Sequence, residues 1–226
     1  MTASGCRSPM SICALRLTRC NSNGSPVGGH TAGAVSLVGG IGSLKWTSVI
    51  LQGDDIAELD GCGGLAVVRK YPDRLKRQDV EIDFLVKSYE LQEIAYDAQL
   101  VTHGATVMGA ADIVDTACGA GTSHNGVILE AWGENQECSQ LDGSYPYHRR
   151  VFARAFFTPS DGTMQRGANH LILKGFAQPN SNFGNGPFND LGDLSSISSW
   201  VGATVEDTAL PSASDDCGYV TTPSQS

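Results

Sequence analysis

The sequence predicts a mainly β fold, an antiparallel β-sandwich or partly closed barrel with one flanking α-helix. Between Val127 and Leu191, short apolar runs rich in β-branched and aromatic residues alternate with Gly, Pro, Asn and Asp, as in antiparallel strands joined by turns. The chain of 226 residues also contains 27 glycines and nine prolines, which favours many turns. Only one stretch has clear helical periodicity. We expect one β-domain over residues 1–192, with a flexible N-terminus at 1–10.

The first third of the chain alternates strand patterns with turn signals. Residues 12–19 place Cys13, Leu15 and Leu17 on one side and Ala14, Arg16 and Thr18 on the other, which predicts a half-buried strand. The glycine-rich stretch 28–43 fits either a loop or a weakened strand. Further strands are predicted at 44–51 and 65–70. An acidic, Gly-rich connection separates them, and Tyr71-Pro72-Asp73 is expected to make a turn.

The clearest strand pattern covers residues 74–87. Its apolar members, which share one face, are Val80, Ile82, Phe84 and Val86, whereas Asp79, Glu81 and Asp83 share the other face. Strict alternation of this kind places one face on a core and the other in water. The three carboxylates repel one another along that face, and the preceding basic residues of 74–77 are candidates to offset the repulsion from a neighbouring strand.

One amphipathic helix is expected at residues 89–100. Ser88 can cap it, Glu90 lies in its first turn, and Leu91, Ile94, Ala95 and Ala98 follow helical spacing. The Gly/Ala-rich residues 101–126 are expected to form a long loop. After the β-rich region, residues 193–226 are rich in Ser, Thr, Asp and Pro, and they are predicted to form an extended C-terminal arm.

The strand pattern R-R-V-F-A-R-A-F-F is a candidate contact surface. Alternation predicts that Arg150, Phe152, Arg154 and Phe156 share one face, where they could stack nucleic-acid bases or meet another subunit. The net charge of −9 favours a subunit contact, because binding to phosphates requires basic residues. Glu130, between Leu129 and Ala131, is either a buried carboxyl or an outward residue on an alternating strand.

Motifs for catalysis or ligand binding are not found, so no enzyme activity, cofactor or metal is expected. The glycine patterns lack a Walker A lysine or a dinucleotide fingerprint, and no G-x-S-x-G or H-E-x-x-H occurs. The seven cysteines include no C-x-x-C pair, which argues against a zinc knuckle. We also expect no secretory signal, no membrane-spanning helix and mostly reduced thiols, as in a cytoplasmically made protein.

The order of several motifs resembles a known family. C-A-L-R-L-T-R-C-N-S-N-G-S-P-V, D-G-C-G-G, R-L-K-R-Q-D-V-E-I-D-F, I-L-E-A-W-G-E-N-Q-E-C, R-V-F-A-R-A-F-F-T-P, F-G-N-G-P-F-N-D and a final D-C-G-Y follow one another along the chain. This series is similar to the major tail tube proteins of long-tailed, non-contractile (siphovirus-type) phages of actinobacteria. The stretches at 28–43 and 101–126 depart from the family pattern.

The resemblance implies a structural virion protein of the phage tail, assembled in the host cytoplasm. Its copies would form stacked hexameric rings, a hollow tube that conducts DNA during ejection, with tail terminator, tail tip and tape measure proteins as partners. Asp79, Glu81 and Asp83 then become candidates to line the lumen and repel DNA, with the outer tube surface as the competing placement. Alternative functions are another virion β-protein, such as a tail terminator or decoration protein, or a β-sandwich carbohydrate-binding module or hydrolase.

Overall fold

The computed structural model describes most of the chain. Its described residues are 8–27, 33–59, 62, 65–85, 88–112, 125–137, 140–141, 145–159, 170–197, 199–212 and 219–220. The expectations for residues 1–7, for Val86 and for most of the last 14 residues fall outside these ranges. Residues 8–10, expected to be flexible, belong to a strand in which Ser8 and Pro9 pair with Gln136 and Asn135.

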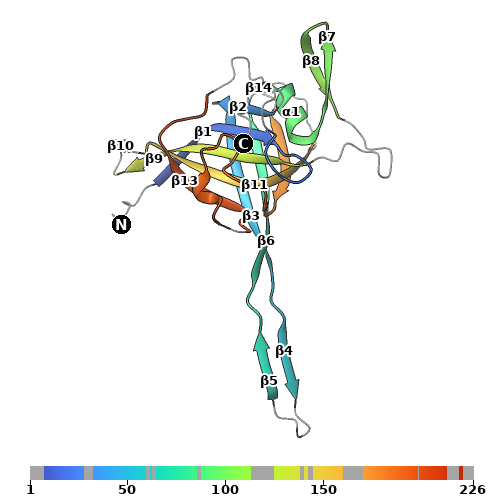
Figure 1. Cartoon of the computed structure of the whole chain (residues 1–226), viewed down its shortest axis with the longest axis vertical. Helices are drawn as coiled ribbons and strands as arrows, with labels where there is room; N and C mark the ends of the chain where they lie inside the picture. The colour runs from blue at the N-terminus through green and yellow to red at the C-terminus, as the bar shows by residue number, and fades with distance from the viewer. Residues whose placement is uncertain are drawn as a thin grey trace.

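The fold is mainly β and antiparallel, with one flanking α-helix, as the sequence predicts (Figure 1). From one edge to the other, the main sheet runs β14 (Tyr219–Val220), β2 (Ala34–Val38), β1 (Ser8–Arg19), β9 (Val127–Glu137), β11 (Tyr147–Pro159), β12 (Leu171–Ala177), β6 (Arg74–Phe84) and β3 (Ile41–Leu51). Two further strands pair outside this path: β10 (Gln140–Leu141) with β9, and β13 (Gly202–Asp207) with β11. The stretch 28–43 therefore contains a strand at 34–38.

The sheet curls around one core and carries a second core on its other face. The first core joins buried side chains of β1, β2, β3, β6, β9, β11 and β12 with the helix α1 (Tyr89–Tyr96). The second core packs Ile128, Val151 and Ala153 against Phe183, Leu191 and Leu194. Because residues beyond β12 cover this face, Ala14, Arg16 and Thr18 are also buried, and the half-exposed strand predicted at 12–19 is wrong.

The helix and β6 follow their sequence patterns closely. The hydroxyl of Ser88 accepts a hydrogen bond of 3.1 Å from the backbone N–H of Leu91, as an N-cap does. The helix ends at Tyr96 rather than near residue 100, because Asp97 adopts a left-handed conformation (φ 58°). In β6, the side chains of Val80, Ile82 and Phe84 are buried in the first core. The acidic residues between them are partly exposed.

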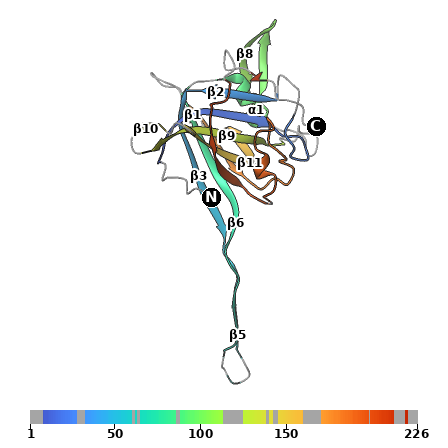
Figure 2. The ribbon, with the colours of Figure 1, turned by 60° about the vertical axis from the view of Figure 1, so that its left-hand side comes forward.

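Two β-hairpins lie partly in segments that were expected to be irregular, although the strand predicted at 65–70 is confirmed as β5. The acidic connection after β3 contains β4 (Asp55–Leu59), which pairs with β5 (Leu65–Lys70). Residues 71–73 do not reverse the chain, because β4 and β5 continue the line of β3 and β6 away from the body (Figures 1 and 2). We call β4, β5 and the outer ends of β3 and β6 the long hairpin. The loop predicted at 101–126 likewise contains part of the hairpin β7 (Gln99–His103)–β8 (Thr106–Ala111).

The segment after β12 packs on the body. Residues 183–190 form turns, and a short 3-10 helix η1 (Gly192–Leu194) follows. The side chains of Leu194 and Val201 are buried, and β13 pairs with β11. The described part of residues 193–212 is therefore joined to the β-domain, which corrects the expected extended arm. Further on, β14 adds to the edge of the sheet beside β2.

Candidate assembly surfaces

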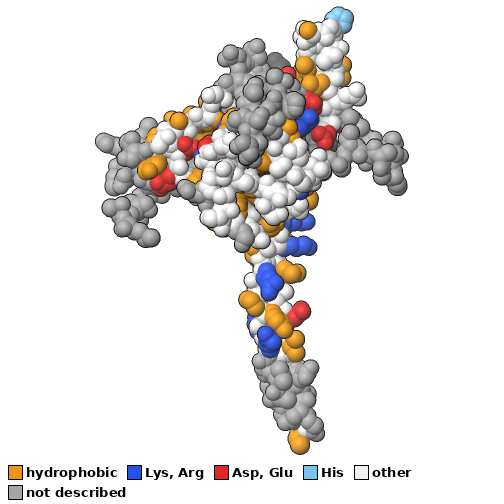
Figure 3. Space-filling view, viewed as in Figure 1, with side chains coloured by type: hydrophobic (Ala, Val, Ile, Leu, Met, Phe, Trp, Pro, Cys, Tyr) orange, Lys and Arg blue, Asp and Glu red, His pale blue; other side chains and the backbone are white. Residues whose placement is uncertain are grey.

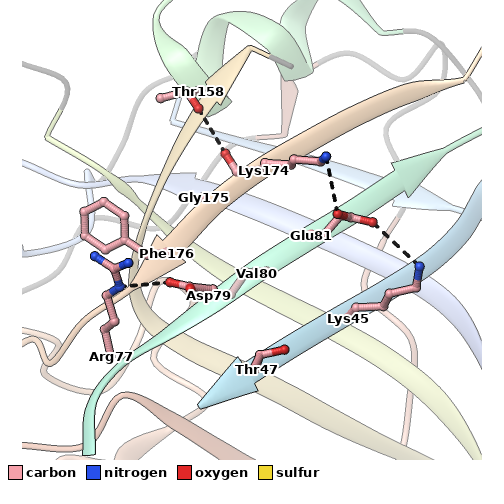
Figure 4. A pocket seen from close by; sticks show the side chains of 10 residues that line it. All are labelled: Lys45, Thr47, Arg77, Asp79, Val80, Glu81, Thr158, Lys174, Gly175 and Phe176. Atoms are coloured by element: carbon pink, nitrogen blue, oxygen red, sulfur yellow. Dashed lines mark hydrogen bonds and ion pairs between the residues drawn. The ribbon is translucent and has the colours of Figure 1, made fainter. Parts of the chain in front are cut away.

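The three acidic residues of β6 lie on the outer face of the sheet, each beside a basic side chain. Register aligns Glu81 with Lys45 of β3 and Lys174 of β12. Its carboxylate oxygens lie 3.6 Å from Lys45 Nζ and 3.8 Å from Lys174 Nζ (Figure 4). Asp79 Oδ1 lies 2.9 Å from Arg77 Nε, and Asp83 Oδ1 lies 2.8 Å from His170 Nδ1. Glu81 and Asp79 are thus paired with permanent cations of the same chain, and Asp83 is hydrogen-bonded to a histidine.

These ion pairs change the electrostatic potential that we expect at this face of the sheet. A uniformly acidic face, as expected, would repel DNA through net negative charge. The observed face alternates positive and negative groups a few ångströms apart, so their fields largely cancel beyond a Debye length of about 8 Å. Of the basic residues expected to act from a neighbouring strand, Arg77 pairs with Asp79 within the same strand β6, whereas the neighbouring strands supply Lys45 and Lys174. The hollow between these side chains is wide, open and about 470 Å³ in volume.

The four residues expected on one face of β11 lie on two faces. A register shift between Phe152 and Ala155 marks a β-bulge in the pairing with β9. Phe152 packs in the first core together with Ala155, whereas Val151 and Ala153 belong to the second core. Strict alternation is broken by the extra residue of a bulge, which a short sequence pattern does not reveal. The single-face prediction is therefore wrong.

The individual side chains consequently have different surroundings. Phe152 is fully buried within the chain, so its ring offers no surface to a partner. Arg150 lines a cleft with Trp46, and its guanidinium carbon lies 5.1 Å from the centre of the Trp46 ring. Phe156 stacks on Phe176 of β12 with 5.4 Å between ring centroids. Arg154 lies over the Phe156 ring at 5.2 Å and donates to the carbonyl of Asn125.

The long hairpin carries apolar side chains with no core beneath them. Among its described residues, the exposed large apolar side chains are Ile50, Leu51, Ile56, Tyr71 and Leu75, which are between 38% and 58% exposed. Figure 3 shows these apolar groups interleaved with basic ones along the projection. Sequence analysis missed this surface because β4 lies within an acidic, Gly-rich segment whose composition is typical of a loop.

Glu130 is the centre of a buried ionic cluster. It is 0% exposed, and its carboxylate binds Arg16 through two hydrogen bonds and Arg149 through one of 3.2 Å. Burial lowers the pKa of Arg149, but Glu130, Asp190 and Asp207 more than offset this and raise it. The cluster ties the segment around Asp190 to the sheet. The sequence left open whether Glu130 is buried or faces outward, and the structure shows that it is buried. Two arginines, Arg16 and Arg149, are paired with its carboxylate.

Three further features bear on chemistry. Among the described residues, no group of three His, Cys, Asp or Glu side chains is placed to hold a metal ion. None of the described helices has both the length and the apolar character that crossing a membrane requires. Burial raises the pKa of the Cys20 thiol to about 12, which keeps it protonated and unreactive.

Comparison with known proteins adds no family assignment. No protein-family model matches the chain, and no curated protein sequence matches it significantly.

Proposed function

We propose that this protein is a structural subunit that assembles with copies of itself into stacked hexameric rings, the hollow tail tube of a siphovirus-type phage. In this proposal the tube conducts DNA during ejection and the chain has no catalytic role. The fold class of an antiparallel β-domain with one flanking helix is the one that the family resemblance implies. The proposal is carried chiefly by one observation, the long hairpin.

A two-stranded ribbon is at best marginally stable alone in water, because it has no core to bury its side chains. The long hairpin nevertheless exposes Ile50, Leu51 and Leu75 at about half of their surface. Solvent-facing strands of a lone monomer rarely retain apolar residues at such density, since exposed apolar edges promote aggregation. Contact with a second subunit would bury these residues, and a repeating contact of this kind builds a polymer.

The edges of the main sheet also suit repeated contact. Among the described strands, β3 pairs only with β6, which leaves its other side outside the ladder. Sheet edges of neighbouring subunits can join and remove the exposed backbone groups. Rings formed in this way would have the sheet as their wall, with one of its faces toward the lumen.

We place the face of β3, β6 and β12 that carries Asp79, Glu81 and Asp83 toward the lumen. Alternating, mutually paired charges present no continuous basic track for phosphates, which would otherwise bind through counterion release. DNA could then slide past without being held. As implied by the family resemblance, tail terminator, tail tip and tape measure proteins would contact the ends and interior of such a tube.

Negative-stain electron microscopy of the purified chain, with and without a tail-tip initiator, tests the proposal. We expect long cylinders of constant diameter, and six-fold symmetry in end-on views. Cylinders that stop at single rings would instead favour a tail terminator. A compact monomer at high concentration that responds to glycans would favour the carbohydrate-binding alternative and overturn the tube assignment.

A further inference from the structure

A cleft lies between the first half of β3 and the strands β1, β9, β11 and β13. Its volume is about 600 Å³. The side chains that define its character are Ile12, Leu44, Trp46, His148 and Arg150. Trp46 is 46% exposed and forms an open aromatic wall. The cleft is thus mostly apolar and aromatic, with one permanent positive charge.

That charge, on Arg150, has no carboxylate partner among the described residues. Its two terminal nitrogens donate hydrogen bonds of 3.1 Å to Thr204 Oγ1 and to Gln78 Oε1, both neutral groups. Its Nε is buried and has no hydrogen-bond partner within the described chain. Burial lowers the pKa of Arg150, and no acidic neighbour offsets this effect.

The neighbouring Arg149 is a useful internal comparison. It points to the opposite face, where Glu130, Asp190 and Asp207 surround it. A buried guanidinium is normally compensated in this way, because an unpaired buried charge is costly. Arg150 is partly buried and lacks such compensation among the described residues, so a carboxylate from a second copy is the group that best completes its site.

The long hairpin carries acidic side chains of the required kind beside apolar ones. Asp54 and Asp55 are exposed, and the side chains of Leu51 and Ile56, which flank them in the sequence, are exposed as well. A segment in which apolar side chains flank two carboxylates complements, in polarity and in charge, an apolar cleft that contains a single cation. The chain does not fill its own cleft in this way, because β4 and β5 extend away from the body (Figures 1 and 2), whereas the cleft is lined by residues of the body.

We propose that this cleft is the acceptor site for the long hairpin of a second copy, whose Asp54–Asp55 pair compensates Arg150 while Leu51 and Ile56 cover Trp46. The inference rests on the proposed self-assembly and gives it a specific contact. Each copy both donates a hairpin and accepts one through a different surface. Such a head-to-tail contact does not close on itself in a dimer, so it propagates along an assembly.

The test uses full-length chains in sedimentation velocity and in acrylamide quenching of Trp46 fluorescence. Asp54→Asn with Asp55→Asn, and separately Arg150→Gln, should each raise the concentration for half-assembly by about tenfold or more, as loss of an interfacial charge partner does. The combined variant should be no worse than either alone, because both remove one contact. Trp46 should be protected from quenching on assembly of the natural chain and stay accessible in the variants.

Lys76→Gln is the matched control, since it removes an exposed charge from the other strand of the same hairpin and should leave assembly unchanged. Circular dichroism checks that Arg150→Gln remains folded, and Arg150→Lys, which keeps the charge, should restore part of the assembly. Tubes that form with unchanged midpoints in all variants would overturn the cleft contact and leave the tube function standing. If oligomers form that depend on the hairpin but no tubes appear, the cleft contact would stand and the tube function would be overturned. A natural chain that stays monomeric at every concentration would refute both.

Discussion

Arg16 and Glu130 form a two-pronged ion pair in the interior: Nε lies 2.6 Å from Oε2 and Nη2 lies 2.9 Å from Oε1. Both side chains are almost completely buried, and the Arg16 guanidinium also lies 3.7 Å from the centre of the Phe188 ring. Phe188 belongs to the segment that follows β12. The pair therefore fastens this segment to β1 and β9, two strands that are far from it in sequence.

Replacement of Glu130 by Gln should lower the free energy of unfolding by about 3 kcal/mol or more, because it leaves Arg16 and Arg149 buried without their shared anion. Urea unfolding followed by fluorescence measures the loss. Glu81→Gln is the control, since its partners are largely exposed and such pairs contribute about 1 kcal/mol or less. Equal losses in the two variants would show that the buried cluster is not what holds the segment.

Gly53 marks the point where the long hairpin leaves regular strand geometry. A Cβ there would lie 1.9 Å from the backbone oxygen of Tyr71, so any larger residue forces the two strands apart. Gly53→Ala should distort the long hairpin and abolish tube formation while leaving the body as stable as before. Electron microscopy and thermal unfolding measure the two effects.

Gly109→Ala in the hairpin β7–β8 provides the control for Gly53. A Cβ at Gly109 would meet only Val101 Cβ at an ordinary 3.8 Å, so tubes should still form. Normal tubes from the Gly53→Ala chain would mean that assembly does not depend on the shape of the long hairpin.

The stability of the fold should depend on pH through His148. Burial lowers the pKa of His148 below its ordinary value of 6.5. As the pH falls through about 6.5, His148 is protonated in the unfolded chain but not yet in the folded chain. The free energy of unfolding therefore decreases until the pH is below the pKa of His148 in the folded chain. Urea unfolding near pH 7.5 and near pH 5.5 should show a smaller difference for His148→Gln than for the natural chain. The exposed His103, replaced by Gln, should leave the difference unchanged.

A local sequence pattern predicts an element correctly when the surroundings of that element in the fold are those that the pattern implies. In β6, alternation placed Val80 and Ile82 correctly because one sheet face meets the core and the other meets solvent. Helical spacing and a capping serine located α1 for the same reason. The pattern failed for β1, because cover on the face that bears Arg16 comes from Phe188, which lies 172 positions later in the chain.

The candidate sites were less predictable, since they depend on register and on distant contacts. Alternation put Arg150 and Phe156 on one face, but one bulge in β11 separates them. The cations beside Glu81 come from β3 and β12, and only the strand order brings Lys45 and Lys174 to it. The long hairpin escaped notice because its stabilising contacts lie, in our proposal, in other copies of the chain.

The lumen assignment leads to a graded prediction for the outer face of β6. Replacement of Asp79 by Asn, Glu81 by Gln and Asp83 by Asn removes the anions and leaves Lys45, Lys174 and Arg77 uncompensated, and three lysines at these positions add further positive charge. If this face lines the lumen, genome release should slow in the first variant and slow further in the second, because phosphates gain cationic partners whose binding depends on salt.

Tubes should still form in both variants, since these side chains are partly exposed and lie outside the cores. Ejection kinetics from phage particles, measured at low and high salt, provide the readout, and the slowing should diminish as salt increases. Ejection rates that stay equal in all three forms would place this face on the outside of the tube. In that arrangement the same substitutions should instead make intact tubes bind added DNA at low salt, because the new positive charge would face the solution.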